Sequence, residues 1–363
     1  MNKLMRERVP SRIREKLGRN SAITLLSGRD VFAALRNEKL IIMACNARIK
    51  HVIPGIMQAA EELDAVIAFE LTRTEGGLDG GYTGQTPEAF FNTVIECAER
   101  CKFTRPFVIH GDHITVMNSS AEEFEEAEKL LRSQIAAGFT SFAIDASFNP
   151  LQDNINIVDA LAAQVMAEGY GLEVELGKGK PVGGESTITS VAEVKEFLQG
   201  LAACGVKPLL LAMDNGSKSG NYIDGQKINI DLARTMEIYH TARASGVAGL
   251  VQNGITGTPP QIVGKLADYG IRKGNIGTLW QNIAHAGLPF ELMDTMRKWS
   301  KKNRRDIKFA TGVFKDDIDS IPEENARQIN DMAYREAKEL IAAFRAKGSA
   351  TRLSALLEEA GCA

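Results

Sequence analysis

RPFVIHGDH, residues 105–113, is the stretch from which the fold of this chain can be argued. Apolar side chains fill it as far as a polar end at Asp112 and His113, which is the pattern of a strand buried on both faces. The next runs of this kind are SFAIDAS (141–147) and GLEVELG (171–177), and a helical pattern precedes each of them. Strands that alternate with helices predict parallel pairing through βαβ units.

Five further runs extend this alternation in both directions along the chain. They are KLIIMACN (39–46), AVIAFELT (65–72), KPLLLAMDN (207–215), AGLVQNGI (248–255) and GNIGTLW (274–280). Eight buried strands with helical crossovers predict a closed (β/α)8 barrel, the TIM-barrel fold of the α/β class. An open doubly wound sheet is the alternative.

The segments outside the barrel also have helical patterns. Residues 1–38 are expected to be an N-terminal helical extension, the barrel to span about 39–290, and residues 291–363 to be a C-terminal helical appendage. Because no linker rich in Pro, Gly or Ser isolates either segment, residues 1–363 are expected to form one domain. Such segments cap a barrel or build a subunit interface, so a homo-oligomer is expected.

Composition narrows the class of ligand. The 363 residues include 43 Lys and Arg against 46 Asp and Glu, a net charge of −3, whereas a nucleic-acid binder usually has a basic face. No run approaches the ~20 apolar residues that cross a bilayer, and the polar start of the chain lacks the apolar core of a secretory signal. We therefore expect a cytoplasmic protein that binds a small molecule, with no nucleic-acid or membrane partner.

Polar residues stand where the predicted strands end, which is where a barrel of this type has its active site. Asp112 and His113 end one strand, and Asp145 and Glu175 end the next two. An imidazole with carboxylates suits a hard or borderline divalent cation. For Asp112 and His113 taken alone, a hydrogen-bonded pair at the barrel rim is the alternative.

These motifs, in this order, resemble the class II aldolase family, the metal-dependent fructose-bisphosphate and tagatose-bisphosphate aldolases. The matching segments are His110-Gly-Asp112-His113, Ile144-Asp145, Glu173-Val-Glu175-Leu-Gly177, Gly183-Gly184-Glu185, Gly216-Ser-Lys-Ser-Gly220-Asn-Tyr222, Asn253-Gly-Ile-Thr256 and Asn275-Ile-Gly-Thr278. The segment GGYTGQTP (80–87) resembles instead the companion, so-called non-catalytic subunit of tagatose-bisphosphate aldolase.

The resemblance implies a reaction and a role for each matching residue. The reaction is the reversible aldol cleavage of a phosphorylated ketose through an enediolate. Asp112 is implied as the catalytic acid/base, Glu185 as a proton-transfer residue on a mobile loop, and His113 as a metal ligand. The residues expected to hold the substrate or its phosphate are Asn46, Gly220, Asn253, Gly254, Thr256, Asn275 and Thr278.

The chain departs from the family at two metal-binding positions. Ser219 and Asn253 stand where the family has its second and third zinc-binding histidines. The retained set, His113 with Asp145 and Glu175, suits Zn²⁺, Mg²⁺ or Mn²⁺. Because one imidazole remains in place of three, any bound zinc is expected to be held more weakly than in the family.

Lys218, beside the lost histidine, offers a second way to stabilise the enediolate, as a Schiff-base lysine. An exposed loop lysine or a phosphate contact is the alternative for this residue. Two other functions stay open for the whole chain. One is a non-catalytic barrel subunit or partner of a sugar-phosphate aldolase, and the other is a different enzyme on the same fold.

Overall fold

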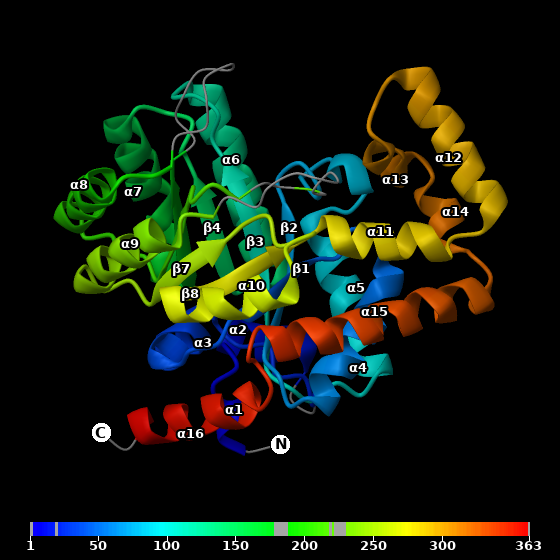
Figure 1. Ribbon diagram of the computed structural model, residues 1–363, viewed down its shortest axis with the longest axis horizontal. Coiled ribbons are helices and arrows are strands. Elements are labelled where there is room, and N and C mark those ends of the chain that lie inside the picture. Colours follow the sequence, from blue (N-terminus) through cyan, green and yellow to red (C-terminus); the bar gives the residue numbers. More distant parts are fainter. Residues whose placement is uncertain (1–2, 19–20, 178–187, 218–219, 221–229, 362–363) are drawn as a thin grey trace.

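The computed structural model describes residues 3–18, 21–177, 188–217, 220 and 230–361. Eight parallel strands form a closed barrel in which each strand pairs with its neighbours in chain order and β8 pairs with β1 (Figure 1). The strands are β1 Ile42–Asn46, β2 Ile67–Thr72, β3 Phe107–Thr115, β4 Ser141–Asp145, β5 Gly171–Leu176, β6 Leu210–Met213, β7 Gly249–Gln252 and β8 Ile271–Ile276. The predicted (β/α)8 barrel is confirmed.

A layer of helices surrounds the barrel (Figure 1). They are α4 Ile53–Glu62, α5 Pro87–Arg100, α6 Ala121–Ala137, α7 Leu151–Ala167, α8 Val191–Ala203, α9 Leu232–Ala244, α10 Pro260–Leu266 and α11 Thr278–Gly287. Local signals start them: the Thr86 side chain accepts a hydrogen bond from the backbone N–H of Ala89, and Ser190 forms a capping box with Glu193. None of the described helices has the length and apolar character required to cross a membrane.

The N-terminal segment covers the N-terminal ends of the strands. It contains α1 Lys3–Glu7, α2 Ser11–Leu17, α3 Gly28–Ala34 and the short η1 Leu35–Asn37. The expected helical extension is interrupted, because Leu25 forms a parallel bridge with Phe107 of β3 and the N–H of Leu26 donates to the Phe107 carbonyl. Leu25 and Leu26 are fully buried, so this extended stretch closes the core below the barrel.

The C-terminal segment is helical, as expected. It contains α12 Phe290–Asn303, η5 Ile307–Phe309, α13 Ala310–Val313, α14 Lys315–Asp319, α15 Glu323–Ala343 and α16 Ser349–Gly361. The long α15 packs against α4 and α11. Gly55 permits this close approach, since a Cβ there would lie 2.2 Å from the Asn330 carbonyl oxygen. Figure 1 shows α12 and α13 rising beside the end of the barrel at which the strands finish.

β8 begins three residues earlier and ends four residues earlier than predicted. The prediction was 274–280, but the strand begins at Ile271, and Thr278 already belongs to α11. The prediction was wrong because Arg272 and Lys273 interrupt the apolar pattern. Both side chains are nevertheless buried, at 5% and 0% exposure.

Candidate active site

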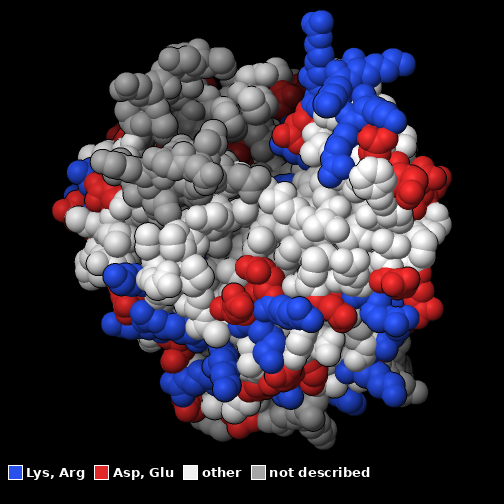
Figure 2. Space-filling view, turned by 45° about the vertical axis from the view of Figure 1, so that its right-hand side comes forward, with Lys and Arg blue, Asp and Glu red and all other residues white. Residues whose placement is uncertain are grey.

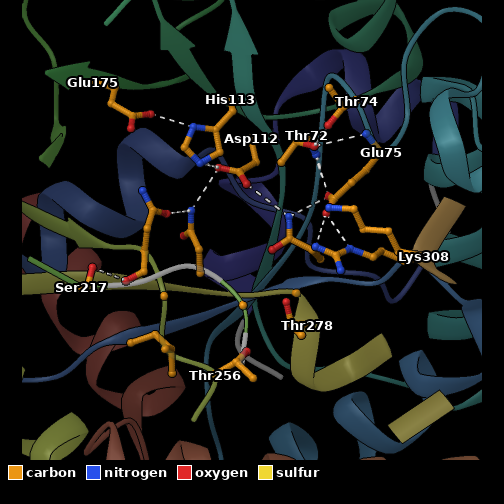
Figure 3. A pocket seen from close by; sticks show the side chains of 18 of the residues that line it. Thr72, Thr74, Glu75, Asp112, His113, Glu175, Ser217, Thr256, Thr278 and Lys308 are labelled. Carbon is orange, nitrogen blue, oxygen red and sulfur yellow. Dashed lines mark hydrogen bonds and ion pairs between the residues drawn. The ribbon is translucent and has the colours of Figure 1, made fainter. Parts of the chain in front are cut away.

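A cavity of about 330 Å³ opens where the strands end (Figure 3). Its lining contains these residues from the sequence-based set: Asn46, Asp112, His113, Glu175, Gly220, Asn253, Gly254, Thr256, Asn275 and Thr278. Asp145 lines a neighbouring recess that shares His113 with the cavity. Glu185, Lys218 and Ser219 lie outside the described residues, so the roles expected for them stay predictions.

An irregular backbone near the end of β3 turns two consecutive side chains towards the cavity. In a regular strand, Asp112 and His113 would point to opposite faces. The pairing of β3 with β4 shifts register between Gly111 and Ile114, and His113 has a φ of 41°, in the left-handed region that non-glycine residues seldom adopt. β3 continues to Thr115, whereas the prediction ended it at His113. The bulge, and not the end of the strand, therefore exposes Asp112 and His113 to the cavity.

His113 lies among the carboxylates with which the sequence grouped it. Its Nδ1 is 2.7 Å from Oε2 of Glu175 and 3.5 Å from Oδ2 of Asp145, and one ligand atom from each residue lies within 4.8 Å of the others. Burial alone would lower the pKa of His113, but Asp112, Glu175 and Asp145 outweigh it and raise that pKa well above its usual value. This nitrogen and oxygen donor set fits a divalent ion.

Asp112 is held at both carboxylate oxygens by amides from other strands. The Nδ2 of Asn46 donates to Oδ2 at 3.2 Å, and the Nδ2 of Asn275 donates to Oδ1 at 3.1 Å. Asn275 also donates to the side-chain oxygen of Asn253 at 3.0 Å. Asp112 is 2% exposed, so these bonds fix a carboxylate that faces the cavity.

The loops after β7 and β8 form one side of the cavity, where Thr256 and Thr278 lie close together in Figure 3. Gly254 has a φ of 75°, and the hydroxyl of Thr256 accepts a hydrogen bond from the N–H of Leu279 at 3.2 Å. Thr278 begins α11, so the N-terminus of that helix faces this side. Backbone N–H groups at a helix start, together with hydroxyls, suit a phosphate.

Lys273, which the sequence analysis did not select, points into the barrel one layer below the cavity. Its Nζ lies 2.9 Å from Oε2 of Glu173, 3.1 Å from Oε2 of Glu70 and 3.9 Å from Oδ1 of Asp112, and all four side chains are buried. Burial alone would lower the pKa of Lys273, but Glu173 and Glu70 raise it, while burial and Lys273 hold the pKa of His110 well below its usual value. No pattern in the sequence pointed to it, because Lys273 lies directly before the strand predicted at 274–280.

The sequence analysis also missed a charged wall of the cavity, formed by Arg48, Glu75, Tyr82 and Lys308. Nε of Arg48 and the hydroxyl of Tyr82 donate to Oε1 of Glu75, at 2.6 and 3.2 Å. Tyr82 belongs to the GGYTGQTP segment, so the phenol of that distinctive motif reaches the cavity. Lys308 comes from η5, far away in the chain, and no local pattern could have placed it here.

The chain is similar over most of its length to proteins of one family. The family model for fructose-bisphosphate aldolase class II matches residues 27–348. The fructose-bisphosphate aldolase of Staphylococcus epidermidis is 31% identical over 233 residues, which cover 62% of this chain and 71% of that protein. The fructose-bisphosphate aldolase of Giardia intestinalis is 25% identical over 265 residues, which cover 71% of this chain and 74% of that protein.

Solved structures share the fold. The YdjI aldolase of Escherichia coli K12 superposes with a TM-score of 0.62 at 20% identity, covering 89% of this chain and 98% of the other. A putative fructose-1,6-bisphosphate aldolase of Coccidioides immitis has a TM-score of 0.64 at 18% identity, covering 90% of this chain and 98% of the other. At these identities the likeness shows the barrel architecture alone.

Proposed function

The chain belongs to the class II fructose-bisphosphate aldolase family, and we propose that it catalyses the reversible aldol cleavage of a phosphorylated ketose through an enediolate. The single observation that carries this proposal is Asp112, a buried carboxylate that faces the cavity and is held at both oxygens by amides. In the cleavage direction this carboxylate removes the proton of the C4 hydroxyl while the C3–C4 bond breaks. Asn46 and Asn275 keep it oriented for that transfer.

The electrons of the broken bond pass to the enediolate, whose oxygen requires positive charge beside it. His113, Asp145 and Glu175 would hold a divalent ion of the kind on which this family generally depends, and Zn²⁺, Mg²⁺ and Mn²⁺ all accept these donors. When bound, the ion supplies that positive charge. Glu185 is proposed to return a proton to the enediolate carbon, and a Schiff base at Lys218 is the alternative to the metal.

The proposed phosphate site lies in the loops that carry Gly254, Thr256 and Thr278, together with Gly220. The basic end of α12 supports an anionic substrate, because Arg297, Lys298, Lys301, Lys302, Arg304 and Arg305 are exposed there. Figure 2 shows Lys and Arg gathered at the top of the molecule, next to a hollow in the surface. A cytoplasmic location and a homo-oligomeric state also belong to this proposal.

A non-catalytic barrel subunit is the second candidate, and Asn253 favours it. At this position, where the family has a zinc-binding histidine, the side chain accepts a hydrogen bond from Asn275. The test uses dihydroxyacetone phosphate in D₂O with Mg²⁺, Mn²⁺ or Zn²⁺. Proton exchange at its hydroxymethyl carbon, followed by NMR, together with triose phosphate release from ketose phosphates, supports the enzyme. A protein with neither activity under all three ions is the non-catalytic subunit.

A further inference from the structure

Within the charged wall, Glu75 and Lys308 lie on a different side of the cavity from the phosphate loops, whereas Arg48 lies beside Gly277. In Figure 3, Thr256 and Thr278 stand at the bottom of the view, whereas Glu75 and Lys308 stand on the right. Asp112 and His113 lie above the centre of the view, and the strand that carries them, β3, pairs with β2, whose following loop carries Glu75. A ketose whose phosphate occupies the loops and whose C4 hydroxyl reaches Asp112 would therefore place its other end, beyond the bond that breaks, beside the loop that carries Glu75.

Glu75 is a fixed negative charge in this wall. Its side chain is 3% exposed, and donors occupy both carboxylate oxygens. Arg48 and Tyr82 donate to Oε1, while the backbone N–H of Thr72 and the Nδ2 of Asn46 donate to Oε2 at 2.9 and 3.0 Å. Four donors, one of them a guanidinium, hold the carboxylate in place.

Each of the three nitrogens of the Arg48 guanidinium already contacts a protein oxygen. Its Nε and Nη2 lie 2.6 and 2.5 Å from Oε1 of Glu75, and its Nη1 donates to Oε1 of Gln281 at 2.6 Å. Among the described lining residues, Lys308 is the only other Lys or Arg. Its Nζ lies over the rings of Tyr82 and Phe309, at 5.7 and 5.3 Å from their centroids.

We infer that this wall receives a sugar end that carries hydroxyl groups and no second phosphate, so that the substrate is a ketose monophosphate. This inference rests on the proposed function. A second phosphate placed here would meet the immobile carboxylate of Glu75 and an arginine that is already neutralised. Hydroxyl groups would instead find donors and acceptors in Lys308, Thr72 and Thr74, which also line the cavity. The wall selects by placing a like charge against the wrong substrate.

The test compares kcat/KM for fructose 1-phosphate and fructose 1,6-bisphosphate under the same metal ion. We expect the monophosphate to be preferred at least tenfold, and an equal or reversed preference would overturn the inference. Proton exchange in dihydroxyacetone phosphate tests the proposed function separately from the preference for a monophosphate, because that fragment does not extend to the charged wall. Exchange with a bisphosphate preference leaves the proposed function standing, whereas loss of both exchange and cleavage removes the function itself.

Variants locate the selectivity. Glu75→Gln keeps the shape of the side chain but removes its charge and releases Arg48, so the ratio of the two kcat/KM values is expected to move at least tenfold towards the bisphosphate. Any effect of Glu75→Gln that reaches Asp112 through Asn46 changes kcat/KM for both substrates alike. The ratio of the two kcat/KM values is therefore the quantity to compare. Lys308→Met is the matched control of opposite charge, and its ratio is expected to move further towards the monophosphate. A ratio that Glu75→Gln leaves unmoved contradicts the role of the carboxylate.

Discussion

Two groups of ionisable side chains lie one above the other in this barrel, and each contains one histidine and two carboxylates. The mouth group is His113, Asp145 and Glu175, while the interior group surrounds Lys273 with Glu70, Glu173 and His110. The His113 side chain is 17% exposed and lines the cavity, whereas His110 and Lys273 are sealed at 1% and 0%. The interior group therefore contains its own cation, and the mouth group faces a space that an external cation can enter.

The two histidines show what this difference does. Burial and Lys273 lower the pKa of His110, whereas surrounding carboxylates outweigh burial and raise the pKa of His113. The pKa of the same side chain is thus shifted in opposite directions about one layer apart. Composition alone does not define a metal site, because a lysine beside the carboxylates can already supply the positive charge.

The largest expected effect is at Asp112, which lies between the two groups. Asp112→Asn keeps the shape of the side chain but removes the base, so ketose phosphate cleavage is expected to fall about 10³-fold, or roughly 4 kcal/mol in barrier. Steady-state release of triose phosphate measures this loss. Proton exchange in dihydroxyacetone phosphate is the internal control, since it does not require the C4 hydroxyl base. Cleavage within tenfold of the unaltered protein would remove Asp112 from the mechanism.

Replacing the internal cation tests the interior group. Lys273→Met leaves buried glutamates without their ammonium, and we expect the free energy of unfolding to fall by about 3 kcal/mol. Urea titration followed by circular dichroism measures it. The double variant with Glu173→Gln, which removes one of the orphaned charges, is expected to recover about 1 kcal/mol of that loss. A single variant as stable as the parent would show that Lys273 does not compensate these carboxylates.

Metal binding tests the mouth group. His113→Ala is expected to weaken Mn²⁺ or Zn²⁺ binding by a factor of about 30, or roughly 2 kcal/mol, because it removes the imidazole of the retained donor set. Isothermal titration calorimetry measures the affinity. Glu70→Gln, in the interior group, is the matched control and is expected to change the affinity less than threefold. An equal loss of metal affinity in the two variants would contradict binding of the ion at the mouth group.

The smallest expected effect is a pH dependence from His110. Its pKa in the folded protein lies well below 6.5, so the unfolded chain binds a proton first as the pH falls, and stability is lost below about pH 6.5. Between pH 7 and 5.5 this contribution is about 1 kcal/mol. His110→Asn, which has no titrating imidazole, should lose that much less stability over this interval in urea titrations. Identical losses in both proteins would contradict the neutral state of His110.

Much of the barrel followed from sequence, because buried strands and amphipathic helices carry their own local periodicities. β8 was misplaced because this reasoning assumes that a lysine faces water, whereas Lys273 is satisfied by glutamates on two distant strands. Strand alternation likewise could not bring Asp112 and His113 to the mouth together. A bulge and the positive φ of His113 turn both side chains to the mouth, and no residue type in the sequence predicts either feature.

The residues selected from the sequence line the cavity together because parallel strands all finish at the same end of a barrel. The charged wall escaped prediction for the opposite reason. Glu75 and Tyr82 stand in one loop, Arg48 follows another strand, and Lys308 comes from the C-terminal segment. Their hydrogen bonds link parts of the chain that the sequence keeps far apart, and no spacing rule joins them.

The position of Lys273 on the last strand has a consequence for the order in which the chain can fold. A partial barrel of β1 to β7 has two open sheet edges, and it holds Glu70 and Glu173 without the cation that they face in the finished barrel. Docking of β8 closes both edges and delivers that cation in the same event. An incomplete barrel is therefore destabilised both by unpaired backbone groups and by unpaired buried charge. This favours folding in a single cooperative step.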